Sequence, residues 1–559
     1  MWRRVVTMNK WKWLYYLFVP GLCLWLAWPP IGIFVLLFVG FVPLLQLQEE
    51  WQNRSGIRWW MWLYGSLFFW NLFTTWWVWN STLPGAVAML VLNSLFMTIP
   101  WMLYRYSRKK LGDPAVYLFV IFWLTYEYLH HRWDLSWPWL TLGNGLASAP
   151  WLVQWYDITG TLGGSAFVLA MNVLIWKAWK YSGIMKNRPN NGMVFFFFFM
   201  LPPTRKAPFW RNHLLLAMAL FLFVLASSLF NAWKWERTVK PDTTLKVAVC
   251  QPSYDPWTEK FARPSDEMVT ELINLSKPVL DKNTYLLVWP ETSLTSAIDV
   301  DHIRQHADVA SVAALNREYP SLNILTGADM QQVYENCRER PNGTARPTQD
   351  PTLWWNAYNS ALLIGSGPIE YYHKSILVPG TEQMPFVQQF SWIDKLAVQL
   401  DDNSISGSLG KSPAPKVFNA GKIKAAPIIC YESIYGDYTG RFVKDSADVL
   451  CVITNDAWWG NTPGYKQHLA YAGLRAIEHR RWLVRSANTG ISGFINPYGE
   501  VVKETEWWEK TALSQEISID SERRMTLYTR MGDLAWLMIL GGLSLSLGIA
   551  YYLRLKTRA

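Results

Sequence analysis

The sequence predicts a multi-domain protein, in which a bundle of about eight transmembrane helices is joined to an α/β domain. Hydrophobic residues make up 51% of the 559 residues and charged residues only 17%, whereas soluble proteins carry about 25% charged residues. Apolar windows close to the roughly 20 residues that cross a bilayer recur along the chain. Between residues 240 and 525, short β-branched runs alternate with helical patterns instead, as is typical of a buried sheet covered by helices.

Eight apolar windows are predicted to cross the membrane, and they cover residues 13–29, 31–47, 59–79, 84–104, 115–131, 151–176, 213–233 and 534–553. The first two windows are separated only by Pro29-Pro30, so a tight turn must join them. The phenylalanine run at 195–199 is too short to cross and is assigned to a loop. No small-residue cleavage site follows the first apolar run, which predicts an uncleaved first span rather than a signal peptide.

Lysine and arginine gather before the first window, after each even-numbered window and at the end of the chain, whereas the odd-numbered loops are nearly free of them. Because such clusters mark cytoplasmic loops, both termini are predicted to be cytoplasmic. After seven crossings the α/β domain lies on the opposite, extracytoplasmic side. The predicted divisions are residues 1–239, a transmembrane domain of seven spans; residues 240–525, the α/β domain; and residues 526–559, a last span with a cytoplasmic tail.

The α/β domain is predicted to contain buried strands at 245–249, 285–289, 323–326, 361–364, 427–429, 449–454, 483–486 and 493–495. Helical patterns alternate with them at 267–280, 309–317 and 465–481, and polar loops are expected at 334–355 and 400–416. The net charge of +10 comes without a nucleic-acid-binding motif, so no nucleic acid partner is expected.

Three polar side chains stand at or just beyond the ends of predicted strands: Glu291, Lys374 and Cys430. A carboxylate that accepts a proton, an ammonium that stabilises an oxyanion and a thiol nucleophile are the parts of covalent acyl transfer. Each residue also has an ordinary interpretation. Cys430 could be a core cysteine, Glu291 half of a structural ion pair, and Lys374 a solvated lysine. The five cysteines show neither metal-ligand spacing nor a disulfide framework, so no metal or other cofactor is expected.

Short motifs occur in order around these residues, namely Trp137-Pro138-Trp139-Leu140, Gly163-Gly164, Tyr372-His373-Lys374, Leu377-Val378-Pro379, Cys430-Tyr431-Glu432, Asn455-Asp456-Ala457-Trp458-Trp459-Gly460, Gln467-His468, Arg475-Ala476-Ile477-Glu478 and Arg485-Ser486-Ala487-Asn488. With them the chain resembles the nitrilase superfamily, whose members carry a Glu-Lys-Cys triad in an αββα sandwich. Over nearly its whole length it resembles more closely the apolipoprotein N-acyltransferases, membrane enzymes that complete bacterial lipoprotein maturation.

This resemblance implies Glu291 as base, Lys374 as oxyanion stabiliser and Cys430 as nucleophile. It also implies Glu382 as a second essential carboxylate, Tyr431 and Glu432 as supports of the pocket, and Trp257 as part of a lid. A membrane-interface anchor accounts equally well for an exposed tryptophan at 257. The other motif residues are expected to be structural or substrate-shaping, and they are Asn455, Trp459, Arg475, Glu478, Arg485 and Ser486. Departures from the family pattern at Pro252-Ser253, Ile376 and Gly380-Thr381 bear on acyl-chain or substrate preference rather than on the triad.

The expected reaction moves an acyl chain from a phospholipid to Cys430 as a thioester, and then to the α-amino group of a diacylglyceryl-modified apolipoprotein. The resemblance further implies a monomer in a bacterial inner membrane. Two alternatives stay open. One is a membrane-anchored carbon–nitrogen hydrolase acting on a small amide or nitrile, for which a single anchor would suffice. The other is a catalytically silent protein that binds lipid or lipoprotein.

Overall fold

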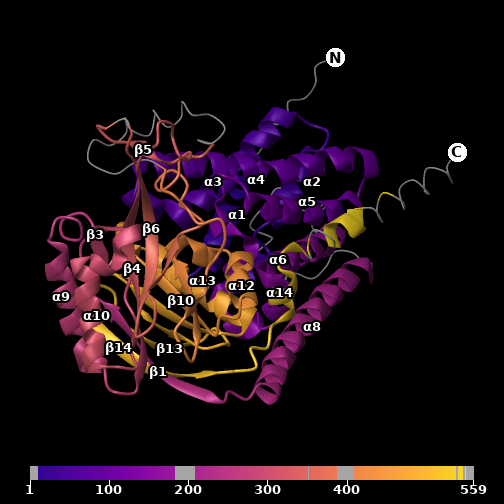
Figure 1. Ribbon diagram of the computed structural model, residues 1–559. Helices are drawn as coiled ribbons and strands as arrows, with labels where there is room; N and C mark the ends of the chain where they lie inside the picture. Colours follow the sequence, from indigo (N-terminus) through magenta and orange to yellow (C-terminus); the bar gives the residue numbers. More distant parts are fainter. Residues whose placement is uncertain are drawn as a thin grey trace.

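The fold is taken from a computed structural model, which describes residues 10–182, 208–350, 352–386 and 408–534, with residues 536, 539–544 and 548. The N-terminal region is helical, and its elements are α1 (Lys10–Ala27), η1 (Phe34–Phe38), α2 (Val42–Trp51), α3 (Gly56–Thr75), η2 (Trp76–Asn80), α4 (Leu83–Leu111), α5 (Ala115–His130), η3 (Pro138–Leu140), η4 (Leu142–Ser148), η5 (Pro150–Leu152), α6 (Tyr156–Tyr181) and α8 (Pro208–Thr238). Figure 1 shows these helices gathered beside the strands.

Helix ends follow local sequence signals, as α4 illustrates. The Thr82 hydroxyl accepts a hydrogen bond from the Gly85 amide at 3.3 Å, and Pro84 occupies the first turn, where its missing N–H costs nothing. The helix stops at Gly112, whose φ of 70° is a left-handed conformation that glycine adopts without strain. Arg108, Lys109 and Lys110 in the last turn complement the helix dipole.

Each of the first seven predicted windows contains helix. The second window is not one continuous α-helix, because the 3₁₀ turn η1 precedes α2. Among the described residues, four segments are long and apolar enough to cross a membrane, and they are Phe34–Trp51, Leu83–Leu111, Tyr156–Tyr181 and Trp210–Thr238. The apolar helices Lys12–Ala27 and Ala115–His130 are shorter. The eighth window and the run at 195–199 lie mostly or wholly outside the described residues.

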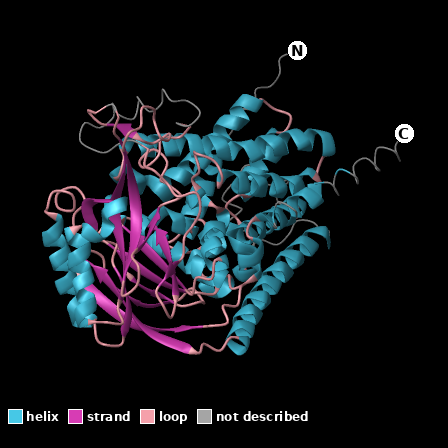
Figure 2. Ribbon diagram, viewed as in Figure 1, coloured by secondary structure: helices cyan, strands magenta, loops and turns pink. Residues whose placement is uncertain are grey.

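The remainder contains two β-sheets (Figure 2). Their strands are β1 (Thr243–Gln251), β2 (Thr284–Val288), β3 (Leu294–Asp299), β4 (Asn323–Tyr334), β5 (Arg346–Pro347), β6 (Trp354–Ile364), β7 (Glu370–His373), β8 (Phe418–Asn419), β9 (Lys424–Ile429), β10 (Val449–Thr454), β11 (Trp482–Ala487), β12 (Gly493–Ile495), β13 (Val501–Glu504) and β14 (Thr511–Ile519). The first sheet runs β14-β1-β2-β4-β6-β5, with β3 on β4 and β7 on β6, and the second runs β13-β12-β11-β10-β9-β8. Neighbours β1, β2 and β4 are parallel, as are β9, β10 and β11.

The sheets pack face to face between two helical layers. Along β1, Val247 and Val249 belong to the core shared with β9 and β10, whereas Ala248 belongs to the core under α9 (Ser265–Ser276) and α10 (Ala307–Glu318). This alternation is the period-2 pattern of a strand buried on both faces. The second sheet is covered by α12 (Gly436–Lys444) and α13 (Pro463–His479). The result is the expected αββα sandwich.

The eight predicted strands are all present, several of them longer than expected. The helix expected at 267–280 ends as α9 at Ser276 and continues as a 3₁₀ turn, η7 (Lys277–Val279). The helix expected at 465–481 ends at His479, because Arg480 is left-handed with a φ of 50°. The prediction of a loop over 334–355 was wrong at its edges, since β4 reaches Tyr334 and β6 starts at Trp354, and within it the short strand β5 pairs with β6.

Helix α13 joins the sandwich to the helical region, since it packs against α6 and η4. The Gln467 side chain lies at the centre of this contact. Its Oε1 accepts hydrogen bonds from the indoles of Trp77 and Trp139 at 3.2 and 2.7 Å. Its Nε2 donates to the carbonyls of Pro29 and Thr74 at 3.0 and 3.2 Å. One buried amide thus connects α13 to three separate segments of the helical region.

Candidate active site

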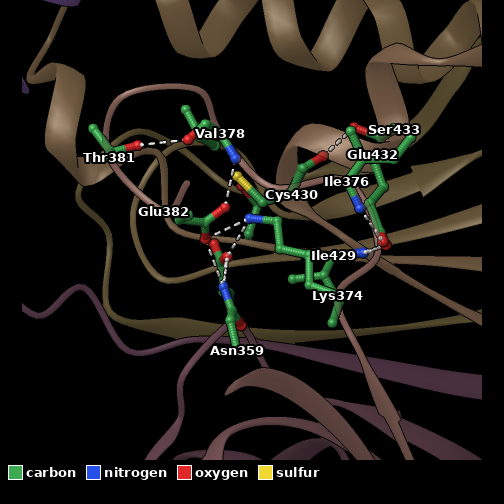
Figure 3. A network of polar contacts seen from close by, with 12 residues as sticks. Asn359, Lys374, Ile376, Val378, Thr381, Glu382, Ile429, Cys430, Glu432 and Ser433 are labelled. Atoms are coloured by element: carbon green, nitrogen blue, oxygen red, sulfur yellow. Dashed lines mark hydrogen bonds and ion pairs between the residues drawn. The ribbon is translucent and has the colours of Figure 1, made fainter. Parts of the chain in front are cut away.

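The three residues expected at strand ends come together between the two sheets. Glu291 follows β2 by three residues, Lys374 follows β7 directly, and Cys430 follows β9 directly. The Lys374 Nζ lies 3.3 Å from Glu291 Oε1 and 2.8 Å from Glu382 Oε1. Figure 3 shows the Cys430 sulfur pointing toward the group that Lys374 and Glu382 form. The candidate site therefore places a thiol beside one ammonium and two carboxylates.

Asn359 completes this group and was not predicted from the sequence. Its Nδ2 donates to Glu291 Oε1 at 2.8 Å and to Glu382 Oε1 at 3.0 Å, so it bridges the two carboxylates. Its backbone carbonyl accepts a hydrogen bond from the Lys374 amide at 2.8 Å. Asn359 lies within β6, and its closeness to β7 arises from strand pairing. No local pattern in the sequence marks that contact.

Glu382 is fixed by its own loop. Its Oε2 accepts a hydrogen bond from the Val378 amide at 2.8 Å, and its backbone amide donates to the Val378 carbonyl at 3.0 Å. The tight turn between them passes through Gly380, whose φ is 83°. This geometry gives a physical reason for glycine at a position where the sequence departs from the family pattern.

The charges of the site hold Lys374 in its protonated form. Burial alone would lower the pKa of Lys374, but Glu382 and Glu291 outweigh it and raise that pKa well above its usual range. The side chain is 1% exposed. A permanent, desolvated ammonium at this place can stabilise a negatively charged oxygen.

Cys430 has a strained backbone and a thiol whose pKa is raised. Its φ is 47°, a left-handed conformation that costs a non-glycine residue on the order of 1–3 kcal/mol. Burial raises the pKa of the Cys430 thiol, Glu291 raises it further, and Lys374 opposes both. A thiol in this state becomes a nucleophile only when a neighbouring base takes its proton during the attack.

Glu432 ties the turn of Cys430 to the loop of Lys374. Its Oε1 accepts hydrogen bonds from the Tyr372 hydroxyl at 2.6 Å and the Ser375 amide at 2.7 Å, and its Oε2 accepts from the Ile429 amide at 2.9 Å. Burial raises the pKa of Glu432 to about 7 against these donors. The side chain is fully buried, so it supports the site rather than meeting a substrate.

The helical region reaches the site through aromatic residues. The Tyr431 hydroxyl donates to the Ser136 carbonyl at 3.0 Å, and its ring stacks on Trp137. The Trp459 ring lies 4.7 Å from that of Trp77, centroid to centroid, and its backbone carbonyl accepts from Asn80 Nδ2 at 2.8 Å. Tyr431, next to Cys430 in the chain, and Trp459 therefore contact segments that follow α5 and α3.

Trp257 and Asn455 lie in different surroundings. Trp257 is 63% exposed and meets Trp458 edge to face, with ring centroids 4.9 Å apart. Exposure fits both interpretations that the sequence left open, a lid and a membrane-interface anchor. Asn455 is buried and accepts a hydrogen bond from Asn488 Nδ2 at 3.0 Å, which is a structural contact.

The remaining predicted residues make buried structural contacts. Arg475 pairs with Glu478 at 2.7 Å and donates to the Ile434 carbonyl. Arg485 pairs with Asp456, and the Ser486 hydroxyl donates to the Cys250 carbonyl at 2.8 Å. None of these contacts involves Glu291, Lys374 or Cys430.

A second buried lysine, also missed from the sequence, lies behind Glu291. The Lys260 Nζ donates to the Glu291 carbonyl at 2.7 Å, and the residue is 2% exposed. Burial lowers the pKa of Lys260 to about 8, although Glu291, Asp329 and Cys430 oppose it. Burial also raises the pKa of Asp329 to about 7. Lys260 lies in the loop of Trp257, so this hydrogen bond connects an exposed aromatic loop to Glu291.

Two parts of the chain match known protein families. Residues 246–526 match the carbon-nitrogen hydrolase family, and the chain belongs to that family. Residues 20–174 match the apolipoprotein N-acyltransferase N-terminal domain. The chain is 29% identical to an apolipoprotein N-acyltransferase of Chlorobaculum tepidum, over 92% of this chain and 91% of that protein. It is 24% identical to one of Geobacter metallireducens, over 94% and 92%.

Among solved structures, the chain is similar to a mutant amidase of the nitrilase superfamily from Nesterenkonia AN1. The two are 13% identical with a TM-score of 0.35, and the match covers 54% of this chain and 98% of that chain.

Proposed function

We infer that this protein is an apolipoprotein N-acyltransferase. The observation that carries this conclusion is the pairing of a carbon-nitrogen hydrolase domain with an acyltransferase-type N-terminal domain in one chain. Relatives with that name match it over more than nine-tenths of its length. A hydrolase of small amides would need no such helical region.

We propose Cys430 as the nucleophile, Glu291 as the general base and Lys374 as the oxyanion stabiliser, with Glu382 holding Lys374. In the first step Glu291 takes the thiol proton while the sulfur attacks an ester carbonyl of a phospholipid. Lys374 stabilises the tetrahedral oxyanion, and Glu291 returns the proton to the departing lysophospholipid oxygen. The acyl chain remains on Cys430 as a thioester. The 3.3 Å between Lys374 Nζ and Glu291 Oε1 supports these adjacent roles.

In the second step the α-amino group of a diacylglyceryl-cysteine attacks the thioester. The amine loses a proton to Glu291, the C–S bond breaks, and the thiol of Cys430 is restored with an amide as product. Water must be kept away from the thioester, since hydrolysis would waste the acyl chain. The aromatic contacts of Tyr431 and Trp459 with the helical region support a dry, lipid-facing approach to the sulfur.

The proposed setting is a bacterial inner membrane crossed by about eight spans, with both termini cytoplasmic and the sandwich on the other side. The proposed divisions are residues 1–239, 240–525 and 526–559, and the proposed assembly is a monomer. The basic clusters after even-numbered spans support this orientation.

Purified protein incubated with acyl-labelled phospholipid tests the function. We expect a hydroxylamine-sensitive acyl adduct on Cys430, followed by transfer of the label to a diacylglyceryl-modified peptide. Cys430→Ala removes the adduct, whereas Cys337→Ala, which changes a half-buried cysteine outside this group, keeps it. Hydrolysis of a small amide without transfer would favour a hydrolase. A folded wild-type protein with neither activity would favour a silent binding protein.

A further inference from the structure

Ser433, His468 and Asp456 form a second constellation of chemically active side chains beside Cys430. The Ser433 Oγ lies 2.8 Å from His468 Nε2, and His468 Nδ1 lies 3.0 Å from Asp456 Oδ1. These are the contacts of a Ser-His-Asp hydrolase triad. The three residues come from three elements: η9 (Cys430–Ile434), α13, and η10 (Asp456–Trp459).

Burial argues against a hydrolase role for this constellation. Ser433 is 1% exposed, and His468 and Asp456 are each 0% exposed. A nucleophile must reach a substrate carbonyl, and this hydroxyl has no open path to one. Its Oγ instead donates its single proton to the carbonyl of Cys430 at 2.7 Å, so His468 Nε2 donates to the hydroxyl, which is the reverse of the direction in a hydrolase triad. The three residues therefore end in a hydrogen bond to the backbone carbonyl of Cys430.

The array is itself firmly held. Asp456 Oδ1 accepts a hydrogen bond from the Thr454 hydroxyl at 2.8 Å, and Asp456 Oδ2 pairs with Arg485. The Arg485 Nη2 also lies 3.2 Å from His468 Nδ1. Burial raises the pKa of Asp456, but Arg485 and His468 outweigh it, so that the pKa is lowered and the carboxylate stays ionised. Burial lowers the pKa of His468 despite Asp456.

The Cys430 turn needs such support. A φ of 47° at a residue with a β-carbon persists only where the surroundings enforce it. Glu432 holds the residue before Cys430 through the Ile429 amide, and Ser433 holds Cys430 itself through its carbonyl. Without the hydrogen bond from Ser433 to the Cys430 carbonyl, the turn would relax and move the sulfur away from Glu291 and Lys374.

We propose that Ser433, His468 and Asp456 form a positioning array, which holds the Cys430 carbonyl and thereby keeps the thiol aimed at Glu291 and Lys374. The inference rests on the proposed acyl-transfer function. It assigns the three residues a role in the rate of thioester formation, with no role in binding the phospholipid.

Four variants test the array. Ser433→Ala removes the hydroxyl, and Ser433→Thr restores it. His468→Asn keeps an amide near Asp456 in place of Nδ1 but has no atom in the place of Nε2 to contact Ser433. The double variant Ser433→Ala/His468→Asn removes the Ser433 contact with the Cys430 carbonyl as well as its contact with His468. Ser514→Ala on β14 and His302→Gln on η8 (Val300–Gln305) serve as matched controls, because both lie outside the array.

We measure single-turnover thioester formation per folded enzyme, KM for phospholipid, and the rate at which a maleimide alkylates Cys430. Ser433→Ala and His468→Asn are each expected to slow thioester formation about 10- to 100-fold at unchanged KM, since small misplacements of a reacting atom cost rates of this order. Both should change the alkylation rate, the double variant should lose little more than either single variant, and Ser433→Thr should recover most of the rate.

Three results would overturn the inference. The single variants could match wild type in rate per folded enzyme, their losses could multiply in the double variant, or Ser433 could react with a fluorophosphonate in a Cys430→Ala background. If wild type forms no thioester at all, the proposed function fails instead. The alkylation of Cys430 then still tests the array by itself.

Discussion

At the scale of single residues, the main feature of the site is the balance between its buried negative and positive charges. Two carboxylates, Glu291 and Glu382, face one ammonium, Lys374, and the amide of Asn359 donates to both carboxylates. Like charges this close repel strongly in a buried site, and the ammonium and the amide offset that repulsion. Lys374 alone cannot neutralise both carboxylates, and this suits the proposed role of Glu291 as a base.

Lys374→Met should therefore destabilise the fold as well as abolish transfer. Removing one partner of a buried ion pair costs about 3–5 kcal/mol, because the other partner stays buried and unpaired. Thermal unfolding in detergent should show a lower Tm for Lys374→Met and partial recovery for Lys374→Met/Glu382→Gln, with no recovery of thioester formation. Lys416→Met, at a half-exposed lysine, is the control. A Tm for Lys374→Met equal to that of wild type would contradict the ion-pair assignment.

Lys260 should make stability depend on pH in the alkaline range. Its pKa is lowered by burial to about 8, whereas an unfolded lysine titrates near pH 10.4. Between these values the unfolded chain binds a proton that the folded chain does not, so stability rises with pH through that window. The groups facing Lys260 are Glu291, Asp329 and Cys430.

The measurement is Tm against pH for wild type and Lys260→Met, from pH 7.5 to 10.5. Titrations of groups that do not face Lys260 are common to both proteins and cancel in the difference. The Tm of wild type should rise relative to that of the variant across the range. A difference that stays flat, or falls, would show that Lys260 is not held at a lowered pKa.

At the scale of elements, the strands that are buried on both faces could be predicted from the sequence, and the exposed ones could not. Strands such as β2, β9 and β10 are continuous apolar runs that stop at polar residues, so both the strands and the side chains at their ends were found. The edge elements β13 and β14 are largely exposed or half-buried and lack that pattern. Helix α12 was missed because its nine residues include Gly436 and Gly440, which are poor helix formers.

Side-chain contacts between elements that are distant along the chain could not be predicted from the sequence. Asn359 reaches Glu291 because β6 pairs with β4 and β7, and Lys260 reaches it because the loop after β1 contacts the segment that follows β2. Both residues are isolated polar positions without a motif. The roles assigned to Glu291, Lys374 and Cys430 stay predictions, although the structure brings the three together.

The contact between α13 and the helical region should depend on Gln467. Gln467→Leu removes the hydrogen-bond partner of the buried Trp139 indole and of the Pro29 carbonyl, whereas the Trp77 indole keeps its bond to the Thr74 carbonyl. A buried unsatisfied polar group costs about 1–3 kcal/mol. We expect a lower Tm and faster proteolysis between the two regions. Lys466→Leu, at the exposed neighbouring position, should leave both unchanged. Wild-type resistance in Gln467→Leu would mean that apolar packing alone joins the regions.

At the scale of the whole molecule, the apolar surface of the helical region explains the composition. Helix α8 exposes large apolar side chains along its length, among them Leu215, Leu216, Leu222, Phe223 and Phe230. Figure 1 shows α8 along the outside of the molecule. A hydrophobic surface of this kind is unfavourable in water and natural in lipid. The sandwich and its strand-end site lie against the same helical region, which suits substrates that arrive through a bilayer.

The proposed orientation predicts opposite labelling of two exposed positions. Glu339→Cys, in a Cys337→Ser background, lies in the sandwich, and Lys110→Cys lies at the end of α4 in a predicted cytoplasmic cluster. In intact cells with a permeabilised outer membrane, a membrane-impermeant maleimide should label the cysteine at 339 and spare the one at 110. Inverted membrane vesicles should give the reverse. A phospholipid ester and a lipoprotein amine must both reach the sulfur of Cys430, so the sandwich has to lie on the side of the membrane where both are present. Labelling of position 339 only from the cytoplasmic side would place the sandwich on the other side and overturn the proposed topology.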